Sequence, residues 1–287
     1  MSLTLAMVGA GRVGRALGRR LHELGWRIGP VVTRAPQTAR AAVRAIGAGS
    51  AFAGLTRRVL AADAVLIATP DRAIESVAAR LARMGGAEWR GKVVLHTSGA
   101  YDSTVLRPLV RCGAAVGSLH PLQTFSGHAP PRLEGALFVV EGDAAARRLA
   151  RRLVRQLGGA AILLRGRDKP AYHAAGAFAS GHALAILEAA TRILMALGFT
   201  RRQATRALLG LTRETLDNLE RLGPQAAWTG PLSREDLGTV ERHVRALRRF
   251  PRPYGAAYAA LTRLAAAVLV LRPGSLERRL ARILRGA

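Results

Sequence analysis

Short apolar runs alternate with amphipathic segments from the first residues of the chain. Residues 3–8 are apolar, residues 12–24 repeat their apolar positions with a helical period, and residues 28–33 are apolar again. This order predicts a strand, a helix and a second strand. Later apolar runs predict further strands, with helices between most of them: residues 64–68, 93–96, 114–119, 137–140 and 160–164.

Continuous apolar strands joined by helices are typical of a parallel sheet that helices cover on both faces. The last one or two strands are predicted to run antiparallel at an edge. Beyond Lys169 the strand pattern stops, and four or five helices are predicted: residues 170–197, 200–222, 237–247, 254–271 and 275–284. We therefore expect an α/β domain with a doubly wound sheet in residues 1–165 and an all-helical domain in residues 166–287.

The chain carries 44 Lys and Arg against 18 Asp and Glu, a net charge of +26. Because 49% of its residues are hydrophobic, it is nevertheless predicted to fold. The basic surplus is spread over both predicted domains, and no helix-turn-helix or zinc-ligand pattern accompanies it. We expect loose attraction of phosphorylated ligands and no specific nucleic-acid partner.

Cys112 is the single cysteine, which excludes an internal disulfide, and no basic leader precedes the first predicted strand. Both features favour a cytoplasmic protein. Residues 170–187 form an apolar stretch without Asp, Glu, Lys or Arg, but they include His173 and His182. Because this stretch also has only the minimum length for a membrane span, we interpret it as a buried helix and expect no membrane partner.

A glycine-rich motif, Gly9-Ala10-Gly11-Arg12-Val13-Gly14, directly follows the first predicted strand and opens the first helix. Gly9 permits a tight turn, Gly11 leaves room for a pyrophosphate, and Gly14 lets the helix pack closely. The helix N-terminus offers unpaired N–H groups to the phosphates. This context of strand, turn and helix predicts a Rossmann-like dinucleotide site formed by these six residues.

The second predicted strand ends at Thr33 and Arg34, where an NAD-specific site would carry an acidic residue. No acidic residue lies between Glu23 and Asp63. The planar guanidinium of Arg34, with the Thr33 hydroxyl, instead suits the 2′-phosphate of NADP, so NADP is predicted in preference to NAD. Arg12 could reach the same phosphate or be solvated.

Later strand ends should line the same crevice, because ligands of open parallel sheets bind beyond the carboxyl ends of the strands. Thr69, Pro70 and Ser98 are predicted to contact ribose and nicotinamide, although Thr69 and Ser98 could also cap helices. His120 precedes Pro121 at another strand end. We expect its ring to face the crevice and to take part in catalysis.

Several longer motifs resemble one protein family over essentially the whole chain. They are ATPD at 68–71, HTSGA at 96–100, GSLHPLQTF at 117–125, KPAYHAAGAFAS at 169–180 and TGPLSREDLGTVERH at 229–243. With the glycine motif, they are similar to Rossmann-like proteins that carry a C-terminal domain of unknown function numbered 2520. The resemblance implies an NADP oxidoreductase with an architecture similar to pyrroline-5-carboxylate reductase and 6-phosphogluconate dehydrogenase. It also implies a helical second domain that closes the cofactor crevice and forms a homodimer.

The first helix of the second domain carries candidate catalytic residues. Lys169 and His173 are spaced i, i+4 and share one helix face, with Gly176 and Ser180 in the same sector. A desolvated amine can lose its proton, unlike a guanidinium, so Lys169 or His173 is predicted to move the proton that accompanies hydride transfer. Ser180 is predicted to contact substrate. The pair resembles the Lys and Asn of β-hydroxyacid dehydrogenases. Proteins with the C-terminal domain numbered 2520 often have Asn at the position of Gly181.

A polar loop between two predicted helices contains Thr229, Arg234 and Asp236. The family resemblance implies that this loop faces the substrate, and Arg234 could clamp a carboxylate. Thr239 and His243 on the following helix are secondary candidates. No cluster of His and carboxylate residues has metal-ligand spacing, and no serine or cysteine has an activating pattern. We therefore expect neither a metal nor covalent catalysis.

These features predict an NADP-dependent oxidoreductase that transfers a hydride to or from a small, anionic keto, hydroxy, imino or amino substrate. A non-catalytic NADP-binding sensor or scaffold protein is an alternative, since it would need the same cofactor site. A deazaflavin-dependent oxidoreductase on the same fold is another, and it would leave Arg34 without a phosphate.

Overall fold

The computed structural model describes residues 3–127, 131–270 and 274–284 of the chain. Its contacts divide the chain into two compact units, Met1–Ser180 and Gly181–Ala287. The division falls after the first helix that follows the sheet, because Lys169 in that helix is buried against the strand ends of the first unit. The sheet itself ends at Leu163, close to the boundary predicted from the sequence.

The first unit is built on one eight-stranded sheet in the order β3-β2-β1-β4-β5-β6-β7-β8. Strands β1 to β6 run parallel, whereas β7 is antiparallel to β6 and β8 runs parallel to β7. The predicted antiparallel edge is therefore confirmed, and it comprises both of the last two strands. In chain order the strands span Thr4–Val8, Arg27–Thr33, Ser50–Ala53, Ala64–Ile67, Val93–His96, Ala115–Pro121, Leu137–Gly142 and Ala160–Leu163.

The sequence pattern does not predict the edge strand β3. It has four residues, and Phe52 is its one large apolar side chain. Residues 50–53 pair in parallel with residues 30–33 of β2. Backbone pairing with a neighbouring strand, rather than a hydrophobic period, therefore defines this strand.

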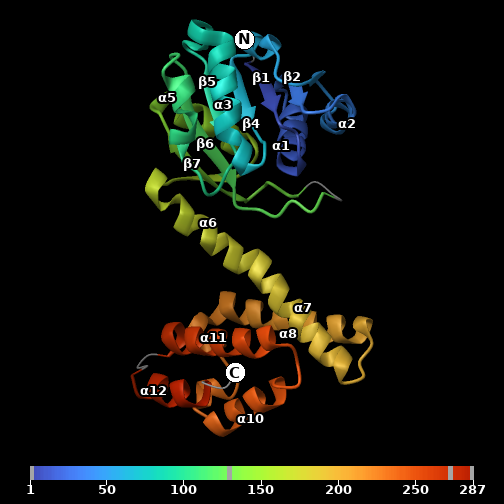
Figure 1. Cartoon of the computed structure of the whole chain (residues 1–287), viewed down its shortest axis with the longest axis vertical. Coiled ribbons are helices and arrows are strands. Elements are labelled where there is room, and N and C mark those ends of the chain that lie inside the picture. The colour runs from blue at the N-terminus through green and yellow to red at the C-terminus, as the bar shows by residue number, and fades with distance from the viewer. Residues whose placement is uncertain (1–2, 128–130, 271–273, 285–287) are drawn as a thin grey trace. The chain divides into compact units, whose positions relative to one another are not determined.

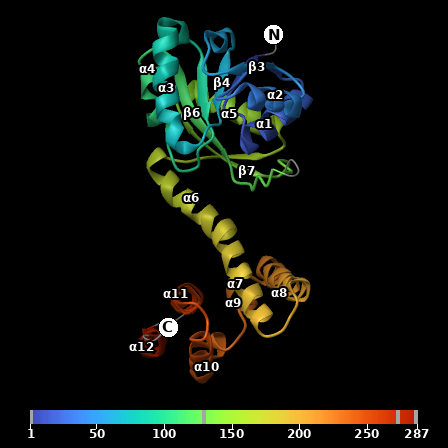
Figure 2. The same ribbon diagram turned by 45° about the vertical axis from the view of Figure 1, so that its right-hand side comes forward.

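Helices cover both faces of the sheet (Figures 1 and 2). Alternate residues of β1 point to opposite faces, so that Leu5 and Met7 enter one core and Ala6 and Val8 enter the other. Helices α1, α2 and α5 close the first core, and α3 and α4 close the second. In chain order these helices span Arg12–Glu23, Pro36–Ile46, Asp71–Gly85, Arg107–Val110 and Ala144–Gln156. The predicted doubly wound architecture is confirmed.

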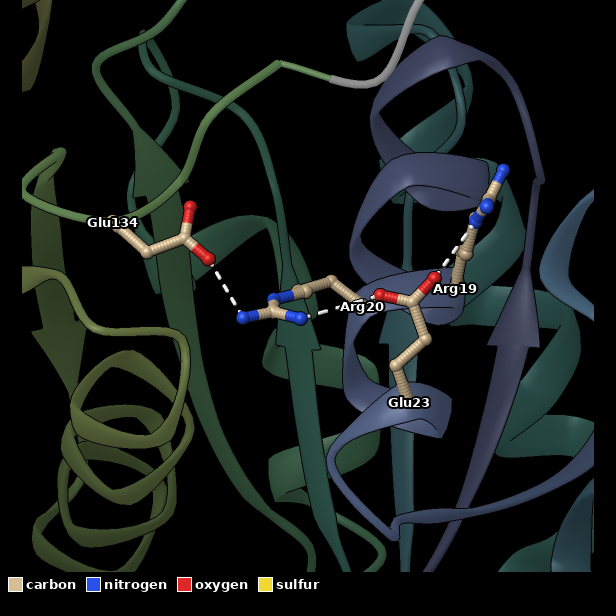
Figure 3. Close-up of polar contacts among 4 residues, drawn as sticks. All are labelled: Arg19, Arg20, Glu23 and Glu134. Atoms are coloured by element: carbon tan, nitrogen blue, oxygen red, sulfur yellow. Dashed lines mark hydrogen bonds and ion pairs between the residues drawn. The ribbon is translucent and has the colours of Figure 1, made fainter.

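An ion-pair network joins α1 to the loop that leads into β7 (Figure 3). Arg20 contacts Glu23 at 3.3 Å and Glu134 at 2.6 Å, and Arg19 contacts Glu23 at 2.9 Å. The side chains are well exposed, so each pair adds little to the free energy of unfolding. The network links the helix that opens with the glycine motif to the chain segment between β6 and β7.

The second unit is helical, as predicted. Helix α7 spans Ala183–Ala196, and α8 to α12 span Arg201–Leu222, Pro224–Ala227, Leu237–Leu247, Arg252–Leu269 and Gly274–Ile283. Its hydrophobic core lies among α10, α11 and α12, where Val240, Val244 and Ala266 are buried. The end predicted for the fourth helix, residue 271, lies outside the described residues. No helix in the described part of the chain is both long enough and apolar enough to cross a membrane.

The single helix predicted over residues 170–197 is interrupted. Helix α6 spans Lys169–Ala177, a π-helical turn follows at Phe178–His182, and α7 begins at the next residue. Within this stretch the Ser180 hydroxyl donates to the Gly176 carbonyl at 2.7 Å. Glycine residues at 176 and 181 have a low helix propensity, which favours a local change of helix type here.

Candidate active site at the strand ends

The glycine motif forms a close-packed turn after β1. Gly9 has a φ of 82°, which favours glycine, and its N–H donates to the Val32 carbonyl at 2.8 Å. A Cβ atom at Gly9 would lie 2.7 Å from the backbone nitrogen of Thr69. A Cβ atom at Gly14 would lie 2.8 Å from the Gly9 carbonyl oxygen. Both positions therefore require glycine, because the turn packs against the end of β4 and against α1.

Gly11 faces open space instead. A Cβ atom at Gly11 would have no heavy atom within 4 Å, and this residue is the exposed N-cap of α1. No side chain caps this helix N-terminus, and its first turn contains no acidic residue. The first N–H groups of an α-helix have no partner inside the helix and carry partial positive charge. The turn is thus an open cradle that suits an anion such as a pyrophosphate.

Thr69 has a buried hydroxyl close to this cradle. Among the residues that the structure describes, none is a hydrogen-bond partner of its Oγ1. The N-cap of α3 is Pro70, and no side chain caps that helix, so Thr69 does not serve as a helix cap. A buried hydroxyl needs a hydrogen-bond partner. A hydroxyl or phosphate group of a ligand beside the glycine motif fits that need.

Ser98 is engaged by the chain itself. Its Oγ accepts hydrogen bonds from the backbone N–H of Ala100 at 3.2 Å and of Tyr101 at 3.1 Å. The predicted capping role therefore takes the form of a turn after β5 rather than a helix N-cap. His96 is fully buried beside this turn. Its Nδ1 accepts a hydrogen bond from the Ser98 N–H, and its Nε2 contacts the Asp102 carbonyl. These contacts shape the loop that approaches the crevice.

Arg34 stands at the end of β2 with its side chain exposed. It makes no ion pair with any carboxylate of the described residues. The Thr33 hydroxyl, in contrast, contacts the Ala35 carbonyl at 2.9 Å and the Thr38 hydroxyl at 2.7 Å. Of the two residues predicted to bind a 2′-phosphate, Arg34 is thus the one with free donors.

The remaining residues of the glycine motif have different surroundings. Ala10 and Val13 pack against the first core of the sheet. Arg12 extends from the N-terminus of α1 toward the segment after β6, where its Nη1 donates to the Phe125 carbonyl at 3.5 Å. A Cβ atom at Gly127 would lie 3.0 Å from Arg12 Nε. Arg12 therefore lies alongside residues 125–127.

Lys169 is completely buried. Its Nζ donates to the Ser98 carbonyl at 2.9 Å and to the Ser118 Oγ at 2.7 Å. Ser118 lies 3.4 Å from Glu141, and Glu141 accepts two hydrogen bonds from Ser103. Burial lowers the pKa of Lys169 to about 8, and the negative charge of Glu141 opposes this shift. The ammonium group therefore fastens α6 to the ends of β5 and β6.

His120, Tyr172 and His173 meet near the Gly99 backbone. His120 Nδ1 lies 2.7 Å from the Tyr172 hydroxyl, and the His120 and His173 rings are 5.6 Å apart. A Cβ atom at Gly99 would lie 2.7 Å from His120 Nε2 and 2.5 Å from His173 Cδ2. Tyr172 is not among the residues predicted from the sequence. Its position three residues after Lys169, on the same helix face, is the signal that could have identified it.

The predicted substrate-binding residues lie in both units. Ser180 is exposed and belongs to the first unit. Thr229, Arg234 and Asp236 belong to the second, where Thr229 and Arg234 are exposed. Asp236 caps α10, because its carboxylate accepts hydrogen bonds from the N–H and the hydroxyl of Thr239 at 3.0 and 2.7 Å. Contact of these residues with a substrate stays a prediction.

Sequence profiles of known families match both parts of the chain. A Rossmann-like domain matches residues 1–121, and a domain of unknown function, DUF2520, matches residues 136–265. The chain is a Rossmann-like protein with a DUF2520 domain. No curated protein matches this DUF2520 protein.

Solved structures share the fold of this DUF2520 protein. A protein from Bacteroides fragilis, described as a candidate NADP oxidoreductase, has a TM-score of 0.74 at 21% identity, over 91% of this chain and 97% of its own. An imine reductase from Myxococcus stipitatus in complex with NADP+ has a TM-score of 0.65 at 20% identity, over 97% and 99%. A pyrroline-5-carboxylate reductase from Coxiella burnetii has a TM-score of 0.57 at 16% identity, over 99% of both chains.

Proposed function

We propose that this DUF2520 protein is an NADP-dependent oxidoreductase that transfers a hydride to or from a small keto, hydroxy, imino or amino substrate. One observation carries the proposal. The open cradle at Gly11, the unpaired Thr69 hydroxyl and the His120–Tyr172 pair all lie at the carboxyl ends of the parallel strands. A dinucleotide site and a group that can move a proton are the two parts that such a reaction needs.

The residues present fit a dinucleotide. The N–H groups at the start of α1 and the bare Cα of Gly11 suit the pyrophosphate, and the Thr69 hydroxyl suits a ribose or phosphate oxygen. Arg34 offers a planar set of donors to a 2′-phosphate. When bound, the cofactor would supply or accept the hydride. The protein would supply the binding groups and the proton.

The structural neighbours support the reaction class. Among them are an imine reductase in complex with NADP+ and a pyrroline-5-carboxylate reductase. A C=N or C=O bond is therefore the proposed substrate group. An anionic substrate is proposed on the ground of Arg234, which is exposed and makes no ion pair with the carboxylates that the structure describes. 

The choice of cofactor is tested by Arg34→Ala. We expect the wild-type protein to bind NADPH at least about tenfold more tightly than NADH, which is about 1.4 kcal/mol. Arg34→Ala should lose this preference, because the 2′-phosphate loses its charged donors. Calorimetric titration at physiological salt measures both affinities, and Arg40→Ala, another exposed arginine on the adjoining α2, is the matched control.

Other outcomes of the titration point to the alternatives. Equal affinity for NADPH and NADH would contradict the NADP preference alone. If neither cofactor binds, the glycine motif serves another ligand, and a deazaflavin becomes the first compound to test. NADPH binding without oxidation by any keto or imino substrate would favour a sensor or scaffold protein.

We also propose a homodimer in which two copies of α8 pair antiparallel. Ala204 is the one buried residue in the 22 residues of this helix. Residues at alternating spacings of four and three lie along one line of a helix surface. In α8 this line consists of Arg202, Arg206, Leu209, Arg213, Leu216 and Glu220. A groove follows its N-terminal half, lined by Arg201, Arg202, Thr205, Arg206, Leu209 and Arg213.

The charge changes sign along this line, which supports a second copy as the occupant of the groove. Arg202, Arg206 and Arg213 make the first part of the line basic, whereas Glu220 at its C-terminal end is acidic. Antiparallel pairing about an axis near residue 211 would bring Arg202 of one copy opposite Glu220 of the other. A two-fold axis forms each such contact twice.

Charge reversal tests this arrangement. Arg202→Glu should weaken the dimer about tenfold, roughly 1.4 kcal/mol, because two attractive pairs become repulsive. Adding Glu220→Arg to the same chain should restore the wild-type affinity. Sedimentation velocity measures the dissociation constants, and Arg151→Glu on the exposed side of α5 is the control. A monomeric wild-type protein, or an exchange that restores nothing, would contradict this pairing.

A further inference from the structure

Tyr172 and His120 form a hydrogen-bonded pair in the first unit. The Tyr172 hydroxyl and His120 Nδ1 are 2.7 Å apart, and the rings meet edge to face with centroids 5.5 Å apart. Tyr172 comes from α6 and His120 from the carboxyl end of β6, and both are partly exposed. The pair therefore lies where open parallel sheets bind their ligands.

Both members of the pair are in their neutral forms near pH 7. Burial raises the pKa of Tyr172 to about 12, so the phenol keeps its proton. Burial, followed by the positive charge of Lys169, lowers the pKa of His120 to about 4, so the imidazole is uncharged. A neutral imidazole carries a proton on one nitrogen and accepts one at the other. The pair can thus pass a proton along without leaving a charge on the ring.

The surroundings of His120 leave room for no side chain at residue 99. A Cβ atom at Gly99 would lie 2.7 Å from His120 Nε2 and 2.5 Å from His173 Cδ2. Glycine at this position lets both imidazoles stand against the loop after β5. His173 is exposed, and its ring is 5.6 Å from that of His120. His120 therefore has the Tyr172 hydroxyl at one nitrogen and an exposed histidine beside its ring.

Lys169 occupies a different position from this pair. Its ammonium group is fully buried and donates to the Ser98 carbonyl and the Ser118 hydroxyl. Unlike the Thr69 hydroxyl, this ammonium group already has protein acceptors. Lys169 lies three residues before Tyr172 on the same helix face. It acts as a positioning residue, because it sets the helix that places Tyr172 against His120.

We infer that Tyr172 is the acid of the proposed reduction and that His120 is its proton relay. This inference rests on the proposed oxidoreductase function, in which the substrate carbon would receive a hydride from a bound nicotinamide cofactor. The electron pair of the C=O or C=N bond moves to oxygen or nitrogen, and that atom takes the Tyr172 proton. The phenolate takes the proton of His120 Nδ1, while Nε2 gains one from a water molecule, which leaves as hydroxide into the solvent. Oxidation reverses each of these transfers.

Tyr172→Phe removes the hydroxyl and keeps the ring. With NADPH and either a pyrroline or pyruvate as the probe substrate, we expect kcat to fall at least about 100-fold. The dissociation constant of NADPH and the melting temperature should be unchanged. Tyr101→Phe, an exposed tyrosine of the same unit, is the matched control and should keep full activity. A Tyr172→Phe protein with wild-type kcat would overturn the inference.

Variants of the two histidines distinguish proton transfer through His120 from a purely space-filling role of its ring. His120→Asn keeps a hydrogen-bonding group near the position of Nδ1 but cannot pass a proton along, so it should lose about as much activity as His120→Ala. His173→Asn should lower kcat by less than about tenfold, because His173 does not contact the Tyr172 hydroxyl in this assignment. A larger loss in His173→Asn than in Tyr172→Phe would assign the acid to His173 instead.

A spectroscopic measurement tests the pair without any substrate. The imidazole nitrogen NMR signal of His120 Nδ1 should shift in Tyr172→Phe and stay in place in Tyr101→Phe. An unchanged signal would show that the hydrogen bond is absent and would overturn the inference. Failure of the wild-type protein to bind NADPH would instead contradict the proposed function, while the NMR result still reports on the pair.

Discussion

Gly11→Ala is expected to fold normally and to bind NADPH at least about 100-fold more weakly, a loss of roughly 2.7 kcal/mol. The backbone of Gly11 has a φ of −71° and a ψ of −159°, which alanine also adopts. Its Cβ atom would meet no protein atom within 4 Å, so the free energy of unfolding should stay the same. The same atom would occupy the space that the pyrophosphate needs. Thermal unfolding and calorimetric titration of one preparation measure both quantities.

Gly9→Ala provides the contrasting variant. Gly9 has a φ of 82°, and its Cβ atom would lie 2.7 Å from the Thr69 backbone nitrogen. This variant should lose about 3 kcal/mol of unfolding free energy, because a strained backbone and a clash act together. Both variants should bind NADPH poorly, but only Gly9→Ala should melt earlier. If Gly11→Ala binds NADPH as the wild-type protein does, the cradle does not hold a pyrophosphate.

Lys169→Met should lower the free energy of unfolding by about 3 kcal/mol at pH 7, since buried acceptors lose a charged donor. The Ser98 carbonyl and the Ser118 hydroxyl now accept from its ammonium group at 2.9 and 2.7 Å. The methionine side chain has a similar length and no donor. Denaturant titration followed by circular dichroism measures the change.

The pH dependence of this difference identifies its source. Burial lowers the pKa of Lys169 from 10.5 to about 8. Between these two values the unfolded chain binds more protons at this residue than the folded chain does. The contribution of Lys169 to stability is therefore constant and at its lowest below about pH 8, where both states hold the proton, and it rises with pH from about 8 to about 10.5. The difference between wild-type protein and Lys169→Met should widen over this window.

Lys92→Met is the matched control for this prediction. Lys92 is the other lysine of the chain, is partly buried, and donates to the Ala62 carbonyl at 3.0 Å. Its replacement should cost about 1 kcal/mol, because one hydrogen bond is lost at a half-exposed site. A Lys169→Met protein that is as stable as wild type would show that the buried ammonium does not fasten α6 to the sheet.

The strands and helices of the first unit could be predicted because their signals are local. In β1 the alternation of Leu5, Ala6, Met7 and Val8 supplies side chains to both faces of the sheet, and every one of them is apolar. The spacing of the glycines in the glycine motif predicts a turn. Strand β3 carries no such signal, because one phenylalanine among small residues has no period.

The candidate site divides in the same way. The positions of the cradle at Gly11 and of Arg34 could be predicted from the order of strand, turn and helix, because this order depends on residues that are close in the chain. The burial of Lys169 could not be predicted in this way, because its acceptors at Ser98 and Ser118 are 71 and 51 positions away along the chain. Helical spacing placed Lys169 and His173 on one face without indicating which of them is enclosed.

By itself, the sequence determined most of the strands and helices of the first unit, the glycine turn and the absence of an acid at the end of β2, since each of these depends on residues that are close in the chain. Only the tertiary structure decided that Lys169 is enclosed and that Tyr172 meets His120, 52 positions away. Such pairings arise when α6 packs onto the ends of the strands. Packing of distant segments is set by the whole fold, and no local period of apolar and polar residues encodes it.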